Sequence, residues 1–270
     1  MKHTKKQHFI PRSILRHHIC MCIPAPPNHI FQYNKDTGTE HLTGIENICC
    51  VNYLYEIKDA NGSINIYHLN KIEKHLSEIE GKFAFVIKNI EHNRISDSDI
   101  NVIRFYIAIQ MLRVPNILEL AKNLAQEVFS FDTNTAENFT KATSLLPGVI
   151  KRDQNILFNA VLKMVCSKYL KIYCSHIPLC LNESYPVLPV VGVPFADYSE
   201  NVSYIFPISY DKCIALLLTD SFEGELVVRI PDTYAKYLNS LAYMANGKYL
   251  YCSVSVKDNM DMLLLKLKKQ

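Results

Sequence analysis

The chain has 270 residues, of which 49% are apolar and 20% are charged. This composition supplies a sizeable core and excludes a disordered or fibrous protein. The net charge of +3 and the pI near 8.3 fall short of the profile of a dedicated nucleic-acid-binding domain, roughly above 9, although a local basic patch could still contact nucleic acid. The length suits one α+β domain, or a core with an appended lobe, better than two independent domains.

Nine cysteines, an odd number, are scattered along the chain. Several lie in apolar runs such as KMVCSKYLKIYC at 163–174, where a thiol behaves as a small apolar group. We therefore expect reduced thiols, as in an intracellular protein. No apolar segment follows Met1, and no run approaches the roughly 18 to 20 apolar residues of a membrane span. We expect a cytoplasmic protein that does not enter a membrane.

The first 70 residues predict short strands and loops. Prolines at positions 24, 26 and 27 forbid a helix there. Alternating residues around a KDTG turn predict a hairpin over about 29–43. The Asn61-Gly62 pair is a strong turn signal, and it predicts a second hairpin over about 48–69.

The next hundred residues predict helices. Apolar residues from Ile72 to Ile90 recur at spacings of three and four, which indicates an amphipathic helix over about 69–90. Ser96 and Asp99 form a capping-box pattern at the start of a helix that runs to about Leu112. Pro115 ends that helix or begins the next one, over 116–129. The polar segment 131–148 predicts a short helix with loops, as a mobile excursion.

The last third predicts strands again. A helix from about residue 152 passes into a strand near KIYCS at 171–175, and five prolines in 177–210 indicate loops and strands. Apolar strands follow in 203–220 and 225–230, and a last helix stops at Asn246-Gly247 before a final strand. The order predicts a single α+β domain over 1–270, with N-terminal strands and hairpins in 1–70, a central helical block in 70–170, and C-terminal strands with a final helix in 170–270.

The motifs of common enzymes and metal sites are weak in this chain. The stretch HHICMC at 17–22 and the pair Cys49-Cys50 could together form a zinc set, but neither cysteine pair has the usual gap of two to four residues. We therefore predict packed thiols and no metal-ligand set. A GxSxG elbow and a glycine-rich phosphate loop are both missing, which argues against a nucleotide-dependent kinase or dehydrogenase.

Polar residues in the predicted helices need partners. Glu80 follows Ile79 at the margin of the apolar stripe, while Gln110 and Arg113, three positions apart, share a face of a largely apolar helix. Such side chains are costly to bury unless they are paired. We predict an ion pair between Arg113 and Glu80, either as a structural clamp or as the floor of a polar site.

Four stretches together carry a family resemblance: QHFIPRSILR at 7–16, KIEKHLSEIE at 71–80, AIQMLRVP at 108–115, and a late YPV…FPIS segment. They resemble a widespread family known only as a domain of unknown function. Its members open with a QHxxPxxYLxxF-like motif, continue with an "IE" helix and a QxxRxP helix, and later show SDxPV before a "PLS" strand. The resemblance extends over nearly the full chain, and it implies no established activity.

Six residues match the family pattern position by position: Gln7, His8, Pro11, Glu80, Gln110 and Arg113. Two positions depart from it. Ser184, with Glu183 beside it, stands where the family has its aspartate, and His18 stands near the phenylalanine that closes the opening motif. If the aspartate is catalytic in relatives, this chain is altered or inactive unless Glu183 substitutes.

The first functional hypothesis is a hydrolase, and within that class a nuclease that acts on RNA or DNA. His8 would act as the general base or as a ligand of a divalent cation, Arg12 and Arg113 would hold a phosphate, and Glu80 or Glu183 would orient the histidine or the cation. Gln7 and Gln110 would complete the substrate-binding set.

The alternative is a non-catalytic binding or regulatory module. Here the same residues form a buried polar clamp that joins the N-terminal segment to the helical block, and Arg113 neutralises Glu80. The departure at Ser184 favours this alternative. The sequence determines neither a substrate nor an oligomeric state.

Overall fold

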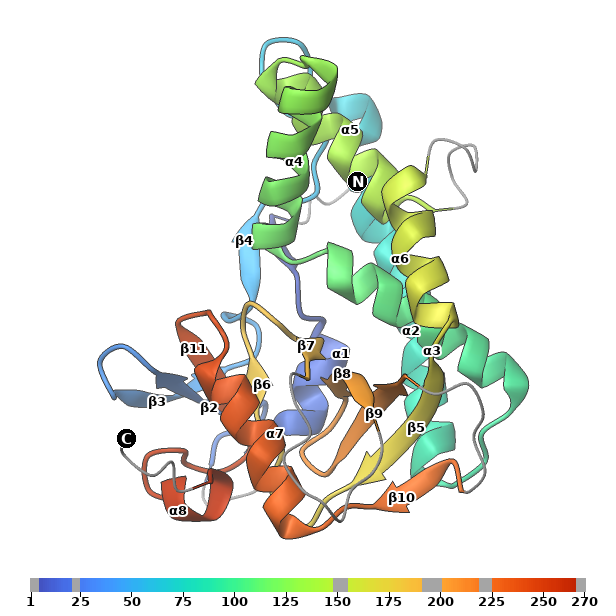
Figure 1. The fold of residues 1–270 in the computed structure, drawn as a ribbon. Helices are drawn as coiled ribbons and strands as arrows, with labels where there is room; N and C mark the ends of the chain where they lie inside the picture. The colour runs from blue at the N-terminus through green and yellow to red at the C-terminus, as the bar shows by residue number, and fades with distance from the viewer. Residues whose placement is uncertain (1–4, 21–24, 148–154, 191–200, 219–224, 266–270) are drawn as a thin grey trace. The chain divides into compact units, whose positions relative to one another are not determined.

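The computed structural model describes residues 5–20, 25–147, 155–190, 201–218 and 225–265 (Figure 1). The chain divides into two compact units, which are described separately. The helical unit comprises Met1–Phe9 and Cys50–Ser167, and the two-sheet unit comprises Ile10–Cys49 and Lys168–Gln270. The predicted α+β class is confirmed. The single domain over 1–270 stays a prediction.

The helical unit contains a two-stranded antiparallel ribbon and a set of helices. In the ribbon, β1 (Lys6–His8) pairs with β4 (Cys50–Asn52), and Gln7 lies opposite Val51. The helices are α2 (Lys71–Glu91), α3 (Asp97–Leu112), α4 (Pro115–Phe129), α5 (Thr133–Leu145) and α6 (Ile156–Cys166), with a 3₁₀ turn at Ile66–His68 before them.

Helices α2 and α3 follow the sequence pattern closely. Every apolar residue of the predicted α2 stripe is buried, and Phe83 on that stripe stacks on Tyr106 of α3 with ring centroids 3.8 Å apart. The capping box at the start of α3 is present, since Ser96 Oγ accepts from the Asp99 amide and Asp99 Oδ2 accepts from the Ser96 amide. Helix α3 ends at Leu112 because Pro115 disfavours helical backbone at the residue before it, and Pro115 then begins α4.

The predicted second hairpin is confirmed at its turn, but its paired region is shorter than predicted. Gly62 turns the chain, with a φ of +78°, and within the described residues the strands around it are reduced to an isolated bridge between Lys58 and Ile64. Two main-chain hydrogen bonds flank that bridge, from the Asp59 amide to the Ser63 carbonyl and from the Asn65 amide to the Ile57 carbonyl, both at 2.8 Å. The main-chain groups of Lys58 point away from this pair, and they bond to the side chain of Asn138 on α5 at 2.9 and 2.7 Å.

The prediction of a short helix with loops over 131–148 is also wrong in extent. Helix α5 runs for 13 residues, and Asp132 caps it by accepting from the amides of Asn134 and Thr135. The polar composition of this segment predicted loops. Its Lys141 and Thr143 are nevertheless buried and hydrogen-bonded within the helical unit, so polar residues here belong to a packed helix.

The two-sheet unit holds a five-stranded sheet of order β10-β5-β9-β8-β7 and a four-stranded sheet of order β3-β2-β11-β6. The predicted hairpin over about 29–43 is confirmed as β2 and β3, and the predicted strand at KIYCS as β5. The strands are β2 (His29–Asn34), β3 (Glu40–Gly44), β5 (Tyr169–Cys174), β6 (Leu181–Asn182), β7 (Leu188–Pro189), β8 (Val202–Pro207), β9 (Lys212–Leu217), β10 (Val227–Arg229) and β11 (Tyr249–Cys252).

Helix α7 (Asp232–Met244) packs into the core of the two-sheet unit. The predicted stop is confirmed, since Gly247 just beyond the helix has a φ of +114° and any Cβ there would lie 2.8 Å from Ser184 Oγ. The shorter helical elements of this unit are α1 (Arg12–Leu15), a 3₁₀ turn at Arg16–His18, and α8 (Met260–Leu263).

Candidate functional site

Gln7 lies at the start of the candidate site. Because side chains alternate along a strand, Gln7 turns inward while its neighbour Lys6 is exposed. The Gln7 side chain is fully buried, and its Nε2 donates to Glu56 Oε1 at 2.7 Å. Its Oε1 accepts from the Tyr55 amide, also at 2.7 Å. One amide side chain therefore fixes the strand to the segment 55–56.

Arg113 brings a full positive charge into the same interior. The residue caps the C-terminus of α3, and only 1% of it is exposed. Its Nη1 donates to Glu80 Oε1 on α2 at 2.7 Å, its Nη2 donates to the main-chain carbonyl of His8, and its Nε donates to the Tyr55 hydroxyl at 3.2 Å. The predicted pair between Arg113 and Glu80 is therefore present.

The electrostatics keep this arginine charged. Burial alone would lower the pKa of Arg113, but the nearby Tyr55 and Glu80 outweigh burial and hold that pKa above its ordinary value. The Tyr55 phenol, also buried, has its pKa raised to about 12 by burial, against the opposing effect of Arg113. Tyr55 thus stays a neutral hydroxyl that donates to the His8 carbonyl at 3.1 Å and accepts from the guanidinium.

Gln110 completes the contacts between α3 and the N-terminal strand. The residue is fully buried, and its Nε2 donates to the Phe9 carbonyl at 2.7 Å. Its Oε1 accepts no hydrogen bond within the described part of the chain. Helix α3 therefore holds two consecutive main-chain carbonyls, those of His8 and Phe9, through side chains three residues apart.

Sequence reasoning missed two members of this set, Tyr55 and Glu56. Glu56 is buried, accepts from Gln7, and also accepts from the Asn70 amide at the start of α2. The sequence did contain a sign that Glu56 needs a partner, because this carboxylate stands between apolar neighbours in the run NYLYEIKD at 52–59. We call the six residues that interlock here the polar clamp: Gln7, Tyr55, Glu56, Glu80, Gln110 and Arg113.

A second ionic group adjoins the clamp. The buried Lys141 Nζ donates to the Glu56 carbonyl at 2.7 Å and to Glu137 at 2.6 Å. Burial lowers the pKa of Lys141, with Glu137 opposing. For Glu137, burial would raise the pKa, but the bonds from Lys141 and Lys58 outweigh it and lower the pKa. Helix α5 is thereby tied to the same interior segment.

The remaining predicted site residues lie in different surroundings. His8 is half-buried in β1, and its main-chain carbonyl, rather than its ring, accepts from Arg113 and Tyr55. Arg12 and Glu183 belong to the two-sheet unit. Arg12 is exposed on α1, while Glu183 is half-buried and its pKa is raised by burial against the nearby charges of Lys248 and Lys35.

The described residues offer few groups that could bind a metal ion. Within them, no three His, Cys, Asp or Glu side chains gather closely enough to hold an ion. Of the zinc set weighed from the sequence, Cys22 lies outside the described residues. Next to the clamp, His8 and Glu80 are both partly exposed, although the Nε2 atom of His8 is buried. Among the described helices, none has the length and apolar character needed to cross a membrane.

The interlocked motifs belong to one stretch of the chain that a family model also recognises. Residues 6–178 match the family described as "Protein of unknown function (DUF4238)". The chain belongs to this family. The match contains every predicted site residue except Glu183, and it ends before the departure at Ser184. Membership confirms the resemblance to an uncharacterised family, while the individual motif assignments stay predictions.

Searches of curated proteins and of solved structures gave no match. The family description names no activity.

Proposed function

We propose that this member of the family is a non-catalytic binding module, in which the polar clamp fixes the N-terminal strand to the helices. One observation carries the proposal: all three guanidinium nitrogens of Arg113 donate to groups of the protein itself, and the side chain is buried. A phosphate could bind there only by displacing Glu80 or the His8 carbonyl.

Gln7 and Gln110 support the same reading. Both are fully buried, and both donate to protein oxygens at 2.7 Å. Substrate-binding amides need at least one group that faces solvent, whereas these face the interior. Both groups of the Gln7 side chain have partners, and buried polar groups that are matched in this way specify one arrangement of the chain, a role best attested for fold register.

A cleavage assay tests the absence of catalysis. The full chain is incubated with end-labelled single- and double-stranded RNA and DNA, with Mg²⁺ or Mn²⁺, beside a His8→Ala variant. We expect both proteins to give the same traces as a protein-free blank. Cleavage by the wild type that is lost in His8→Ala would overturn the proposal.

A hydrolase with nucleic acid as substrate is the second candidate. Its support is the partial exposure of Glu80, whose side chain is 24% exposed while Arg113 holds its other side, together with the half-buried His8. A divalent cation would bridge these two residues in that case. The same cleavage assay separates the candidates.

We also propose the cytoplasm as the location. The cysteines of the described segments are all free thiols, and free thiols are typical of reducing compartments. Exposed Cys166 gives a direct probe, because it would react with a thiol reagent in permeabilised cells without prior reduction. A requirement for reduction before labelling would contradict this location.

A further inference from the structure

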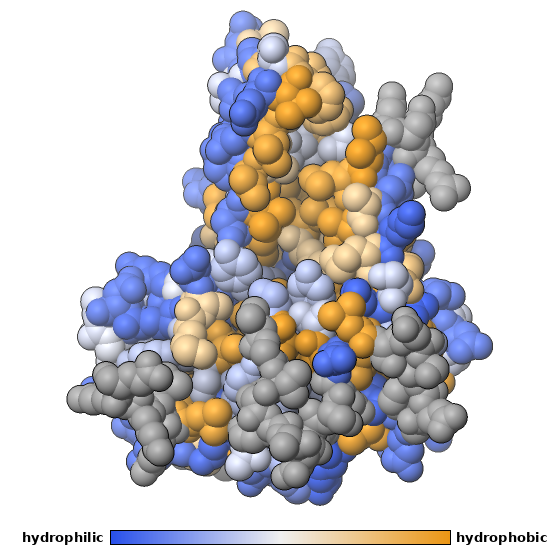
Figure 2. Space-filling view, viewed as in Figure 1, coloured by the Kyte–Doolittle hydropathy of each residue, from blue (hydrophilic) through white to orange (hydrophobic). Residues whose placement is uncertain are grey.

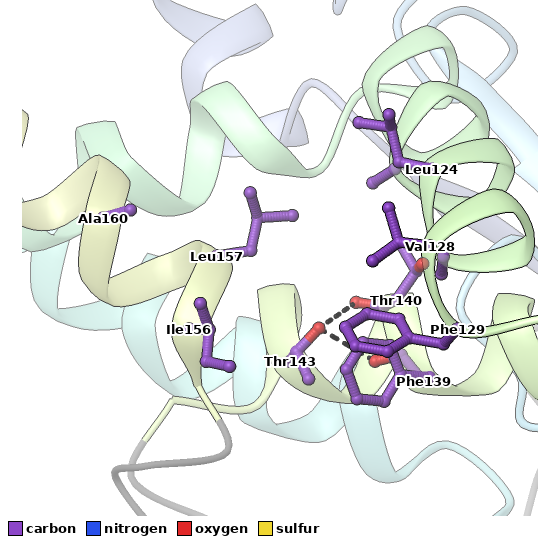
Figure 3. Close-up of a pocket in the computed structure, with 11 residues that line it drawn as sticks. Leu124, Val128, Phe129, Phe139, Thr140, Thr143, Ile156, Leu157 and Ala160 are labelled. Atoms are coloured by element: carbon purple, nitrogen blue, oxygen red, sulfur yellow. Dashed lines mark hydrogen bonds between the residues drawn. The ribbon is translucent and has the colours of Figure 1, made fainter.

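A groove lined by apolar side chains runs between three helices of the helical unit (Figure 3). Helices α4 and α6 form its walls and α5 its floor, and the cavity volume is about 240 Å³. Figure 2 shows apolar side chains gathered over α4 and α6 on the face turned to the viewer. We call this feature the α4–α6 groove.

The exposure of the walls is unusual for side chains of this kind. On α4, Leu120, Leu124 and Val128 follow one another at intervals of four residues, and they are 56%, 51% and 68% exposed. Such spacing places them along one side of the helix. Ile156 on α6 is 65% exposed. The groove is therefore edged by apolar stripes on two helices.

The floor is mainly apolar. Thr140 and Thr143 lie there, and the Thr143 hydroxyl donates to the Phe139 carbonyl of its own helix at 2.9 Å (Figure 3). Sites for small molecules usually exceed 300 Å³ and carry a few polar groups that orient the ligand. The α4–α6 groove has a smaller cavity and a nearly apolar lining, so it suits an apolar occupant better than a small polar ligand.

The amount of exposed apolar surface also limits the occupant. Taking roughly 200 Å² for a fully exposed large apolar side chain, the half-exposed residues that line the groove, Leu124, Val128, Phe129 and Ile156, present on the order of 500 Å². Stable interfaces between two proteins bury about 800 Å² on each partner, of which a little over half is apolar. The apolar area is therefore enough for one helix of a partner, and the choice of a partner helix over a second copy of this chain rests on the charges at the edges of the groove.

Charged residues stand at the edges of the groove. Glu127 follows Leu124 by three positions on α4, and Lys163 follows Ala160 by three positions on α6, so each lies beside its apolar stripe. Both are exposed. One wall thus carries a negative edge and the other a positive edge, which complements a helix with basic residues along one flank and acidic residues along the other.

We propose that the α4–α6 groove binds an amphipathic helix of a partner protein, with large apolar side chains at positions i, i+3/i+4 and i+7 and opposite charges on its two flanks. This mode of recognition places the apolar face of a helix in a groove between helices. The inference rests on the proposed binding role of the chain, and it names the surface and the kind of partner.

The experiment uses a fluorescein-labelled, 18-residue helical peptide with leucines along one face, lysines on one flank and glutamates on the other. Its fluorescence polarisation is measured against the full chain. We expect saturable binding, and at least tenfold weaker binding to Leu124→Glu and to Ile156→Glu. A Leu124→Gln variant supplies a milder change, and far-UV circular dichroism verifies that each variant keeps its helices.

Two controls separate groove binding from general adhesion. Phe85→Glu removes another exposed apolar side chain of the helical unit, on α2 and outside the groove, and we expect unchanged affinity. A peptide of the same composition with the leucines scattered around the helix is expected to bind at least tenfold more weakly. Equal binding of both peptides, or equal weakening by Phe85→Glu, would overturn the proposal.

Other occupants give different outcomes. Sedimentation of the wild-type chain as a dimer that Leu124→Glu converts to a monomer would assign the groove to a second copy and overturn the proposal. Displacement of the peptide by a free fatty acid at equimolar concentration would assign it to a small apolar ligand instead. Failure of peptide binding leaves the cleavage assay unaffected, so the loss of this inference is distinguishable from the loss of the proposed function.

Discussion

The polar clamp and the α4–α6 groove lie in the same helical unit and differ in which side chains they expose to water. The clamp takes a guanidinium and two side-chain amides out of water, at a cost that only matched partners can offset. The groove leaves large apolar side chains in water, at a loss of about 25 cal/mol per Å² that burial would have recovered. The contrast shows that the charged and amide side chains of the clamp bond to the protein itself, whereas the apolar side chains of the groove are the ones left open to a partner.

The largest expected effect comes from breaking the clamp at Arg113. Arg113→Met leaves Glu80 without the Arg113 donor and the His8 carbonyl with the Tyr55 hydroxyl alone, and we expect the free energy of unfolding to fall by about 3 to 5 kcal/mol. Urea denaturation followed by circular dichroism measures it. Arg94→Met, the same change at an exposed position, should stay within about 0.5 kcal/mol. Similar losses in both variants would remove the structural role from Arg113.

A pH series tests how the chain tolerates a buried ionisable group whose nearby carboxylate, Asp211, only partly offsets the effect of burial on its pKa. His18 in the two-sheet unit is fully buried, and burial, with a smaller effect of His17, lowers its pKa to about 4. In the unfolded chain His18 therefore takes up a proton near pH 6.5, whereas in the folded chain it stays neutral until the pH nears 4. Stability from this group is complete above pH 6.5 and is lost as the pH falls toward 4, by about 3 kcal/mol.

The corresponding variants isolate that slope. In His18→Gln the loss of stability between pH 6.5 and pH 4 should shrink, whereas His41→Gln, at an exposed position of β3, should keep the wild-type slope. Urea midpoints at four pH values are sufficient. An unchanged slope in His18→Gln would contradict the assignment.

A smaller effect is expected at Gln7, whose loss leaves Glu56 with fewer donors. Gln7→Ala should cost about 2 kcal/mol, in the range for hydrogen bonds to a charged group. Gln126→Ala removes an amide that bonds Thr133 on the exposed surface and should cost less than about 0.5 kcal/mol. Thermal unfolding of the two variants side by side decides whether the N-terminal strand depends on this amide.

The smallest effect belongs to the groove. Leu124→Ala should change the free energy of unfolding by less than about 1 kcal/mol because the side chain is already half-exposed. Leu118→Ala, on the same helix but buried, should cost about 2 to 5 kcal/mol. Comparable losses would mean that Leu124 belongs to the core and that the groove is no free surface.

Helix positions in this chain could be read from local pattern. The stripe from Ile72 to Ile90 repeats at the helical period, and Ser96 with Asp99 supplies a cap whose hydrogen bonds are formed within four residues. Such features depend on residues that are close in the sequence, so they can be predicted without the tertiary structure. The differences lie in the length of α5 and of the paired region around Gly62, where Lys141 and Asn138 form hydrogen bonds with residues about 80 positions away.

The sequence by itself determined the α+β class, the positions of α2, α3 and α4, the family, and the need of Glu80 and Arg113 for each other. It could not decide what those residues do, because exposure is a property of the folded chain. Only the tertiary structure showed that Arg113 and Gln7 donate to the protein itself, and that Tyr55 and Glu56 complete their set. Likewise, the sequence does not show whether an apolar residue on α4 is buried or exposed. The packing of α5 and α6 beside α4 determines that.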